Sequence, residues 1–233
     1  MLDFGCGEGR LVRELLTAGH DAYGCDLGGD WIDPQQAWTR GLPAEQWRDR
    51  HKLSAIQASP YRLPYADGFF DAVVSTSVME HAQNKAEIFR EIQRVLKPAG
   101  AAVHWLPSKW YLPTEPHIFV PFVSWLWPNV PRWWLSLWAF LGVRDAFQKG
   151  LGWRETAAAN AAYCATGLHY LSRRAYERLV SATGGEPKWL DEFYAANMQG
   201  GAASLLRRLR FIPPALVLRF RMQILLVSRG TGK

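Results

Sequence analysis

Glycines at alternate positions near the start of the chain form the strongest chemical signal. The run from Leu2 to Arg10 is Leu-Asp-Phe-Gly-Cys-Gly-Glu-Gly-Arg, which joins a predicted strand end to a predicted helix. Glycine lets the backbone turn tightly and lets a ligand approach the main chain, and a helix N-terminus offers unpaired N–H groups to an anion. The pattern predicts a nucleotide-like ligand. The dinucleotide fingerprint GxGxxG would need glycine where the chain has Arg10, which argues against NAD.

An acidic side chain at the end of the second predicted strand supports this interpretation. Asp26 follows Gly9 by 17 residues, where a carboxylate can accept hydrogen bonds from both hydroxyls of a ribose. An aspartate at a strand end is also a common turn former, so Asp26 by itself leaves both roles open.

Three histidines are candidates for a general base. His81 follows the fourth predicted strand, His104 lies on the fifth, and His117 stands in the run Glu-Pro-His. A lone histidine is more often structural than catalytic, so both roles stay open for each. The three cysteines form no CxxC pair and no zinc-ligand spacing with histidine, which predicts neither a disulfide framework nor a structural zinc and favours a reducing compartment.

The elements that must position these residues alternate between short apolar runs and amphipathic stretches over residues 1–108. Such alternation is typical of βαβ units and a parallel sheet. Glycine and proline mark the ends of the two clearest helices, at Gly19 and Pro98. The predicted strands are 2–4, 21–26, 53–59, 70–75 and 101–106, and the predicted helices are 10–18, 85–96 and, in pieces, 30–50.

Residues 109–165 differ in composition and are predicted to be an insertion that forms a lid. Residues 105–153 hold eight of the twelve tryptophans, and residues 109–153 hold five prolines. The uncharged run 116–131 has 16 residues and four prolines, too short and too broken for a membrane span of about 20 residues. A short, nearly all-apolar helix over 132–143 must bury itself against protein or lie in a bilayer interface, and both remain open.

Residues 166–233 regain a regular pattern and end in a basic tail. Ser172 can cap a helix that runs to residue 182, and strands near 188–193 and 223–228 can pair as an antiparallel hairpin that completes the sheet. Residues 193–233 carry seven basic and no acidic side chains, whereas the whole chain has a net charge of +6. Such a segment can meet anionic lipid, nucleic acid or a protein partner, or form a solvated face.

Composition places the chain among folded globular proteins. Of its 233 residues, 48% are hydrophobic and 21% are charged, which excludes disordered, collagen-like and disulfide-scaffold classes. Met1 is not followed by a basic and apolar leader, so we expect a cytoplasmic protein, with possible contact to the inner face of the membrane. Only Met1 and Leu2 precede Asp3 in the first strand, whereas chains that resemble this one enter that strand from several apolar residues and an upstream helix, so we expect the chain to be an N-terminally truncated fragment.

Over residues 1–108 the chain resembles the class I S-adenosylmethionine-dependent methyltransferases of the methyltransferase type 11 kind. The matching motifs are LDFGCGEGR, the strand end Cys-Asp-Leu, RLPYADGFFD, Met-Glu-His and RVLKPAG. The resemblance implies an α/β fold, namely a Rossmann-like three-layer sandwich. Its sheet would be mostly parallel and seven-stranded, with the last strand antiparallel.

The resemblance also implies a set of residues that bind S-adenosyl-L-methionine. Asp26 would hold the ribose, Leu27 a face of the adenine, and the main chain near Ser75 the amino group. The methionine end would be held at the glycine loop, by Asp3, Gly5, Cys6, Gly7 and Gly9. Two further residues, Ser59 and Pro60, would lie beside the adenine edge. Relatives often carry an acid at the position of Ser59, and Pro60 lacks an N–H, so we expect fewer adenine contacts.

The predicted activity is methyl transfer to a small-molecule, lipid-linked or sugar acceptor, with His81 and His117 as candidate catalytic residues. Some quinone-forming relatives hold a metal between two acids and the histidine of an ExxEH run; the first acid is Ser77 here, so no metal is predicted. The alternatives are a non-catalytic methyltransferase-fold partner or scaffold, an NAD-dependent oxidoreductase and an RNA methyltransferase. The absence of an [ND]PP[YFW] run after the fourth strand makes nucleic acid an unfavoured partner.

Overall fold

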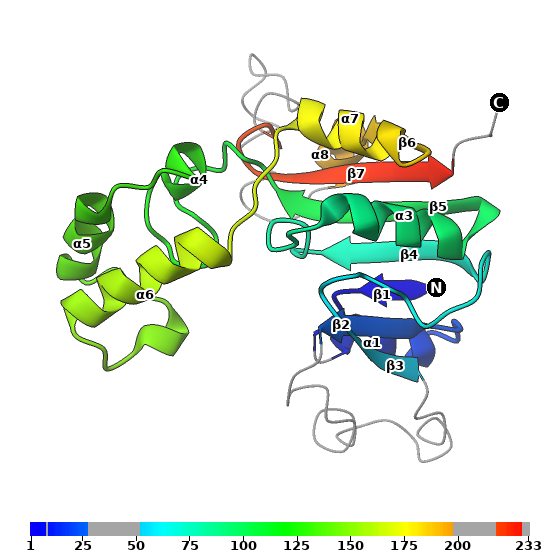
Figure 1. Ribbon diagram of the computed structural model, residues 1–233, viewed down its shortest axis with the longest axis horizontal. Helices are drawn as coiled ribbons and strands as arrows, with labels where there is room; N and C mark the ends of the chain where they lie inside the picture. Colours follow the sequence, from blue (N-terminus) through cyan, green and yellow to red (C-terminus); the bar gives the residue numbers. More distant parts are fainter. Residues whose placement is uncertain (8, 28–51, 198–217, 230–233) are drawn as a thin grey trace.

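A seven-stranded sheet organises the protein. The computed structural model describes residues 1–7, 9–27, 52–197 and 218–229. The strand order is β3-β2-β1-β4-β5-β7-β6; the first five strands in this order are parallel, and β7 is antiparallel to both of its neighbours (Figure 1). The strands are β1 Leu2–Phe4, β2 Tyr23–Leu27, β3 Leu53–Ile56, β4 Phe70–Thr76, β5 Leu96–Pro107, β6 Gly185–Trp189 and β7 Met222–Arg229. The mostly parallel sheet with an antiparallel last strand is confirmed.

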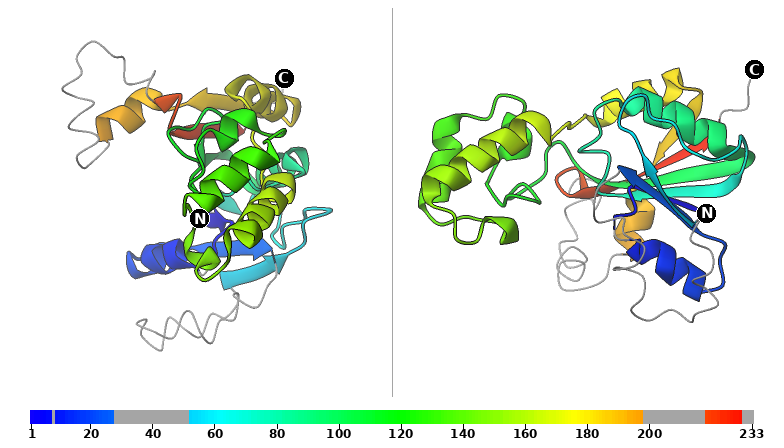
Figure 2. Two further views of the ribbon diagram at one scale, coloured as in Figure 1. Left: turned by 90° about the vertical axis from the view of Figure 1, so that its left-hand side faces the viewer. Right: turned by 60° about the horizontal axis from the view of Figure 1, so that its bottom comes forward.

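Helices cover both faces of the sheet. Helices α3 and α7 lie on one face, and α1 and α8 lie on the other (Figures 1 and 2). Their bounds are α1 Arg10–Thr17, α3 Lys85–Val95, α7 Arg173–Ala182 and α8 Asp191–Asn197. Along α3, Ile88, Phe89, Ile92 and Val95 are buried, so the helix presents an apolar face to the sheet at helical spacing. The result is the three-layer sandwich that the sequence predicts.

The chain between β5 and α7 forms a separate lobe beyond the end of the parallel strands (Figure 1). It contains α4 Val123–Leu126, α5 Arg132–Phe140, a short 3-10 helix at Ala146–Gln148 and α6 Trp153–Thr166. These helices pack on one another around a second hydrophobic cluster: Ile118, Val120, Val123, Leu135, Cys164, Leu168 and Tyr170. The predicted helix over 132–143 is present but ends at Phe140. Among the described residues, no helix is long and apolar enough to cross a bilayer.

Near the C-terminus the structure corrects one predicted element. Ser172 caps α7 by accepting a hydrogen bond from the Ala175 amide at 3.3 Å, and β6 pairs with β7 as predicted. The strand predicted at 188–193 instead ends at Trp189, and helix α8 begins at Asp191. Two acidic residues in the first turn of α8 interact favourably with the helix dipole, and this signal outweighed the apolar pattern.

Smaller differences concern strand ends. The second strand begins at Tyr23 and not at residue 21, and the third strand ends at Ile56 and not at residue 59. The helical pieces predicted at 30–50 and the three tail arginines at 207, 208 and 210 lie outside the described residues.

Candidate functional site

The glycine loop lies at the carboxyl end of β1 and is held by the neighbouring strand. The Gly5 amide donates to the Cys25 carbonyl at 2.7 Å, and the Gly7 amide donates to Asp26 Oδ2 at 2.9 Å. The other carboxylate oxygen, Oδ1, accepts from the Leu27 amide at 2.6 Å. Asp26 therefore joins the loop to the end of β2, and burial raises the pKa of its carboxyl group.

Gly5 and Gly7 of the loop lie in different surroundings. Gly5 has φ +78, and a Cβ atom on it would lie 2.2 Å from Cγ2 of Val78, so no larger residue fits. Gly7 has φ +49, and a Cβ atom there would have no neighbour within 4 Å. The backbone of the loop is thus packed tightly against the segment after β4 on one side and open on the other, where a ligand can approach the main chain.

A cavity of about 180 Å³ lies beside this loop. It is lined by Phe4, Gly5, Asp26, Leu27, Ile56, Tyr61, Ser77, Val78, His81, Ala82 and Ile88. Many of these residues come from the carboxyl ends of β1, β2, β3 and β4 or directly follow them, the usual place for ligands in open parallel sheets. The others come from connecting segments and from α3. Of the predicted binding residues, Gly5, Asp26 and Leu27 line the cavity.

The other predicted binding residues lie around the cavity without lining it. Asp3 is buried inside β1, and burial together with the nearby Asp26 carboxylate raises its pKa to about 6. Cys6 packs its side chain toward α1, against Val12 and Ala22. Gly9 is the N-cap of α1 in the left-handed conformation, with φ 72.

Residues predicted near the adenine edge and the amino group are also outside the lining. Ser59 and Pro60 are exposed, and the Ser59 hydroxyl accepts from Asn84 Nδ2 at 3.4 Å. Ser75 is buried within β4, where its hydroxyl is hydrogen bonded to His104 Nδ1 at 2.8 Å. Two residues farther along, Ser77 reaches the cavity. His104 is completely buried, its pKa is lowered to about 3 by burial, and it contacts the Phe89 ring, away from the cavity.

His81 and His117, which are 36 residues apart in sequence, come together where the lobe joins the sheet. Their Nε2 atoms are 3.3 Å apart. His81 Nδ1 is 2.7 Å from the carbonyl oxygen of Gly167, and His117 Nδ1 is 2.8 Å from Glu115 Oε1. Since His81 also lines the cavity, the pair connects the cavity to the lobe.

Glu115 is the anchor of this pair. Its carboxylate is fully buried and accepts hydrogen bonds from the amides of His117 and Ile118 and from the hydroxyl of Tyr170 at 3.0 Å, in addition to the His117 ring. Burial raises the pKa of this carboxyl group, but the hydrogen bonds and the His117 charge prevail and hold it below its usual value.

Glu80 completes the group and was not selected from the sequence. It is 1% exposed, burial raises its pKa to about 7, and among the described residues neither carboxylate oxygen has a hydrogen-bond partner from another residue. Ligand atoms of Glu80, His81 and His117 lie within 4.8 Å of one another. The only signals for this group in the sequence are the pairs Glu-His at 80–81 and Glu-Pro-His at 115–117, which do not indicate that they meet.

Comparison with known proteins finds similarity in the sheet region. Residues 2–104 match the family model for a methyltransferase domain. Over 113 residues, or 48% of the chain, the sequence is 33% identical to sterol 24-C-methyltransferase ERG6B of Gibberella zeae and covers 29% of it. It is 34% identical over 104 residues, 44% of the chain, to norajmaline N-methyltransferase of Rauvolfia serpentina and covers 34% of it. The matched segment spans about a third of the length of these relatives.

A solved structure resembles the chain over nearly its whole length. The S-adenosylmethionine-dependent methyltransferase from Mesorhizobium loti matches 98% of this chain and 89% of its own, with a TM-score of 0.56 and 16% sequence identity. At this identity the likeness shows a shared Rossmann-like fold.

Proposed function

We propose that this chain, whose residues 2–104 match a methyltransferase-domain model, is a class I methyltransferase that binds S-adenosyl-L-methionine and transfers its methyl group to a small-molecule acceptor. The observation that carries the proposal is the Asp26 carboxylate, which lines the cavity and is fixed by two amides. A carboxylate has about four acceptor positions, so two remain for the hydroxyls of a ribose.

The residues around the cavity suit the parts of the cofactor. Leu27 and Ile56 offer apolar contacts to an adenine ring, and the open side of Gly7 allows the methionine end to approach the backbone. Asp3, two residues before Gly5, is assigned to the same end of the cofactor. Bound S-adenosylmethionine supplies a methyl group made electrophilic by the attached sulfonium.

The protein's own task is to align the acceptor with that methyl group, since an in-line displacement depends mainly on positioning. His81 is the better placed of the two candidate bases, because it lines the cavity. His117 meets it at 3.3 Å from the lobe and would reach an acceptor only beside His81. A base is needed only where the acceptor must lose a proton.

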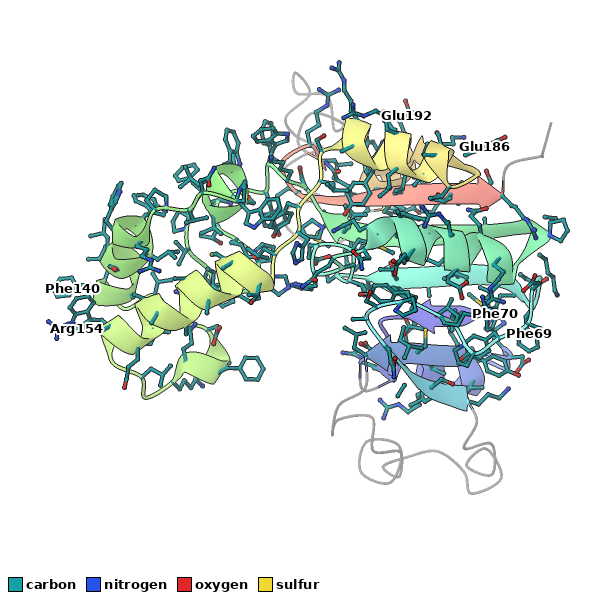
Figure 3. The ribbon with its side chains drawn as sticks, in the orientation of Figure 1. Phe69, Phe70, Phe140, Arg154, Glu186 and Glu192 are labelled. Carbon is teal, nitrogen blue, oxygen red and sulfur yellow. The ribbon has the colours of Figure 1, made fainter. Side chains whose placement is uncertain are left out.

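We further propose that the acceptor is a lipid-linked, isoprenoid or sugar molecule and that the lobe can meet an anionic membrane surface. Large apolar side chains are exposed on the lobe, among them Trp133 at 66% and Phe140 at 69%. Phe140 lies at the outer tip of the lobe, far from the sheet (Figure 3). Flat aromatic faces suit such acceptors and the interfacial region of a bilayer.

Calorimetric titration with S-adenosylmethionine and S-adenosylhomocysteine tests the cofactor site. We expect binding by the unaltered chain and a loss of at least about tenfold in Asp26→Ala, because two hydrogen bonds to a charged group are removed. Asp21→Ala is the matched control, since Asp21 is exposed and precedes the same strand; its affinity should be unchanged. Binding of NADH in place of these ligands, or equal affinity in Asp26→Ala, would overturn the proposal.

The alternative of a non-catalytic partner protein makes a different prediction for the same samples. Such a protein would bind the cofactor weakly or not at all and would transfer no methyl group to any acceptor. Release of S-adenosylhomocysteine in the presence of a panel of lipid, isoprenoid and sugar acceptors separates the two functions.

A further inference from the structure

The ring of His81 is held in one orientation by the main chain. Its Nδ1 atom is 2.7 Å from the carbonyl oxygen of Gly167. A carbonyl oxygen can only accept, so Nδ1 carries the proton, and in the neutral ring Nε2 has a free lone pair. Nε2 is the atom that points to His117.

The ring of His117 is held in the matching orientation by a side chain. Its Nδ1 atom is 2.8 Å from Glu115 Oε1, and the Glu115 carboxylate already accepts from two amides and a tyrosine hydroxyl. Nδ1 must donate to this carboxylate, which in the neutral ring leaves the lone pair on Nε2. A carboxylate behind a histidine in this way fixes the tautomer and orientation that metal-binding histidines need.

With both rings neutral, the two free lone pairs therefore face each other, and either a proton or a metal cation between them removes the repulsion. Two nitrogens bound to one zinc ion at about 2.0–2.1 Å in tetrahedral geometry lie about 3.3 Å apart. The Nε2 atoms of His81 and His117 are 3.3 Å apart. The separation fits two ligands on one cation, as well as a hydrogen bond through one proton.

Glu80 supplies the third donor. Its carboxylate is nearly fully buried, and among the described residues no other residue gives either oxygen a hydrogen bond. A buried carboxylate without partners is costly, and a cation removes that cost. Its ligand atom lies within 4.8 Å of both histidine nitrogens, so a small side-chain movement brings it to the same ion.

We propose that Glu80, His81 and His117 bind a divalent transition-metal cation, with Zn²⁺ as the representative ion, at the joint between sheet and lobe. Two imidazoles and one carboxylate favour zinc and its first-row neighbours over Mg²⁺ or Ca²⁺. This proposal departs from the expectation of no metal, which rested on Ser77, because the structure brings His117 of the lobe beside Glu80 and His81.

This site has two consequences for the molecule. It ties residues after β4 to a residue of the lobe, so a bound cation stabilises their docking. It also competes with a role of His81 or His117 as a base, because both lone pairs become ligands. The metal site does not depend on methyl transfer and can be tested without it.

The test is a Zn²⁺ titration of the full chain after removal of metals with a chelator. We expect one strongly bound ion per chain, a rise in thermal stability on binding, and no comparable effect of Mg²⁺. His117→Gln should weaken binding at least about 100-fold, and Glu115→Gln, which alters the residue that positions His117, about 10–100-fold. His20→Ala is the matched control, because His20 is exposed and lies outside the cluster; it should bind like the unaltered chain.

Two outcomes of the titration would overturn the metal site. One is that the unaltered chain does not bind zinc, which would mean that the two rings share a proton instead. The other is an affinity for Zn²⁺ in His117→Gln that equals that of the unaltered chain. Should His117→Gln lose its fold by circular dichroism, X-ray absorption of the unaltered zinc-loaded chain decides the question: two imidazole nitrogens and oxygen support the site, whereas a sulfur shell assigns the metal to cysteine and overturns it.

Discussion

The sheet and the lobe are held together in different ways. In the sheet, the glycine loop and Asp26 are positioned by strand pairing and by backbone amides. One hydrophobic cluster runs beneath the sheet from β1 to β7. In the lobe, a smaller cluster holds the helices together, and the joint to the sheet depends on a few buried polar side chains around Glu115 and His117.

This difference indicates where a single substitution should change stability most. A repeating hydrogen-bond ladder spreads its stability over many backbone groups, so it tolerates most side-chain changes. A joint made of a few buried charged groups concentrates its stability, because removing one partner leaves others buried without a hydrogen bond. Changes at the joint should therefore affect the lobe alone, and changes in the loop should affect the sheet.

The largest effect is expected for Glu115→Gln. Loss of the charge that orients His117 and accepts four hydrogen bonds should destabilise the lobe by about 4 kcal/mol, the typical cost of breaking a buried pair. Hydrogen exchange followed by mass spectrometry should show faster exchange in α5 and α6 and unchanged exchange in β4 and β5. Equal acceleration in both regions would show that they are one cooperative unit.

Asp3→Asn should stabilise the sheet at neutral pH. Burial raises the pKa of Asp3 from 3.8 to about 6, so the folded protein holds this proton more tightly than the unfolded chain, and its stability falls as pH rises from about 4 to 7. A shift of about 2 pKa units corresponds to about 3 kcal/mol. Urea unfolding at pH 4 should give similar stabilities for both proteins, and at pH 7.5 the variant should be more stable. A pH-independent difference would contradict this.

Gly5→Ala should lower the free energy of unfolding more than Gly19→Ala does, although both glycines have a positive φ, +78 and +84. A Cβ atom at Gly5 meets Val78 at 2.2 Å, whereas at Gly19 it meets nothing within 4 Å. The clash should add about 2 kcal/mol to the shared backbone strain. Denaturant unfolding measures both, and equal losses would mean that the contact with Val78 relaxes freely.

The smallest effect on stability is expected for the double substitution Trp133→Ser and Phe140→Ser. Both side chains are largely exposed, so the free energy of unfolding should change by no more than about 0.5 kcal/mol for each. Co-sedimentation with vesicles rich in anionic lipid, in low salt, should nevertheless decrease. Undiminished sedimentation, or none by the unaltered chain, would remove the lobe as a membrane-contact surface.

The fold of the sheet region could be predicted because its signals are local. Apolar runs, Gly19 and the acid at Asp26 each act over a few residues, and five predicted strands and two helices are present with shifted ends. The errors fall where local signals compete. The run after Trp189 has the composition of a strand, but its two acids start α8 instead.

The candidate site was predictable only in part. The sequence pointed to the loop, to Asp26 and to two histidines as separate features. It did not indicate Glu80 as a member of the same group, nor Ser77 rather than Ser75 as a cavity residue, since β4 ends one residue later than predicted.

By itself, the sequence determined the elements, the glycine loop and the carboxylate beside it, because strand and turn preferences depend on neighbours in the chain. Only the tertiary structure decided that His117 and Glu115 of the lobe meet Glu80 and His81 after β4. That meeting depends on how the lobe folds back through Gly167 and Tyr170, whose contacts span more than 50 residues. No local preference encodes such a contact; packing and the pairing of buried polar groups do.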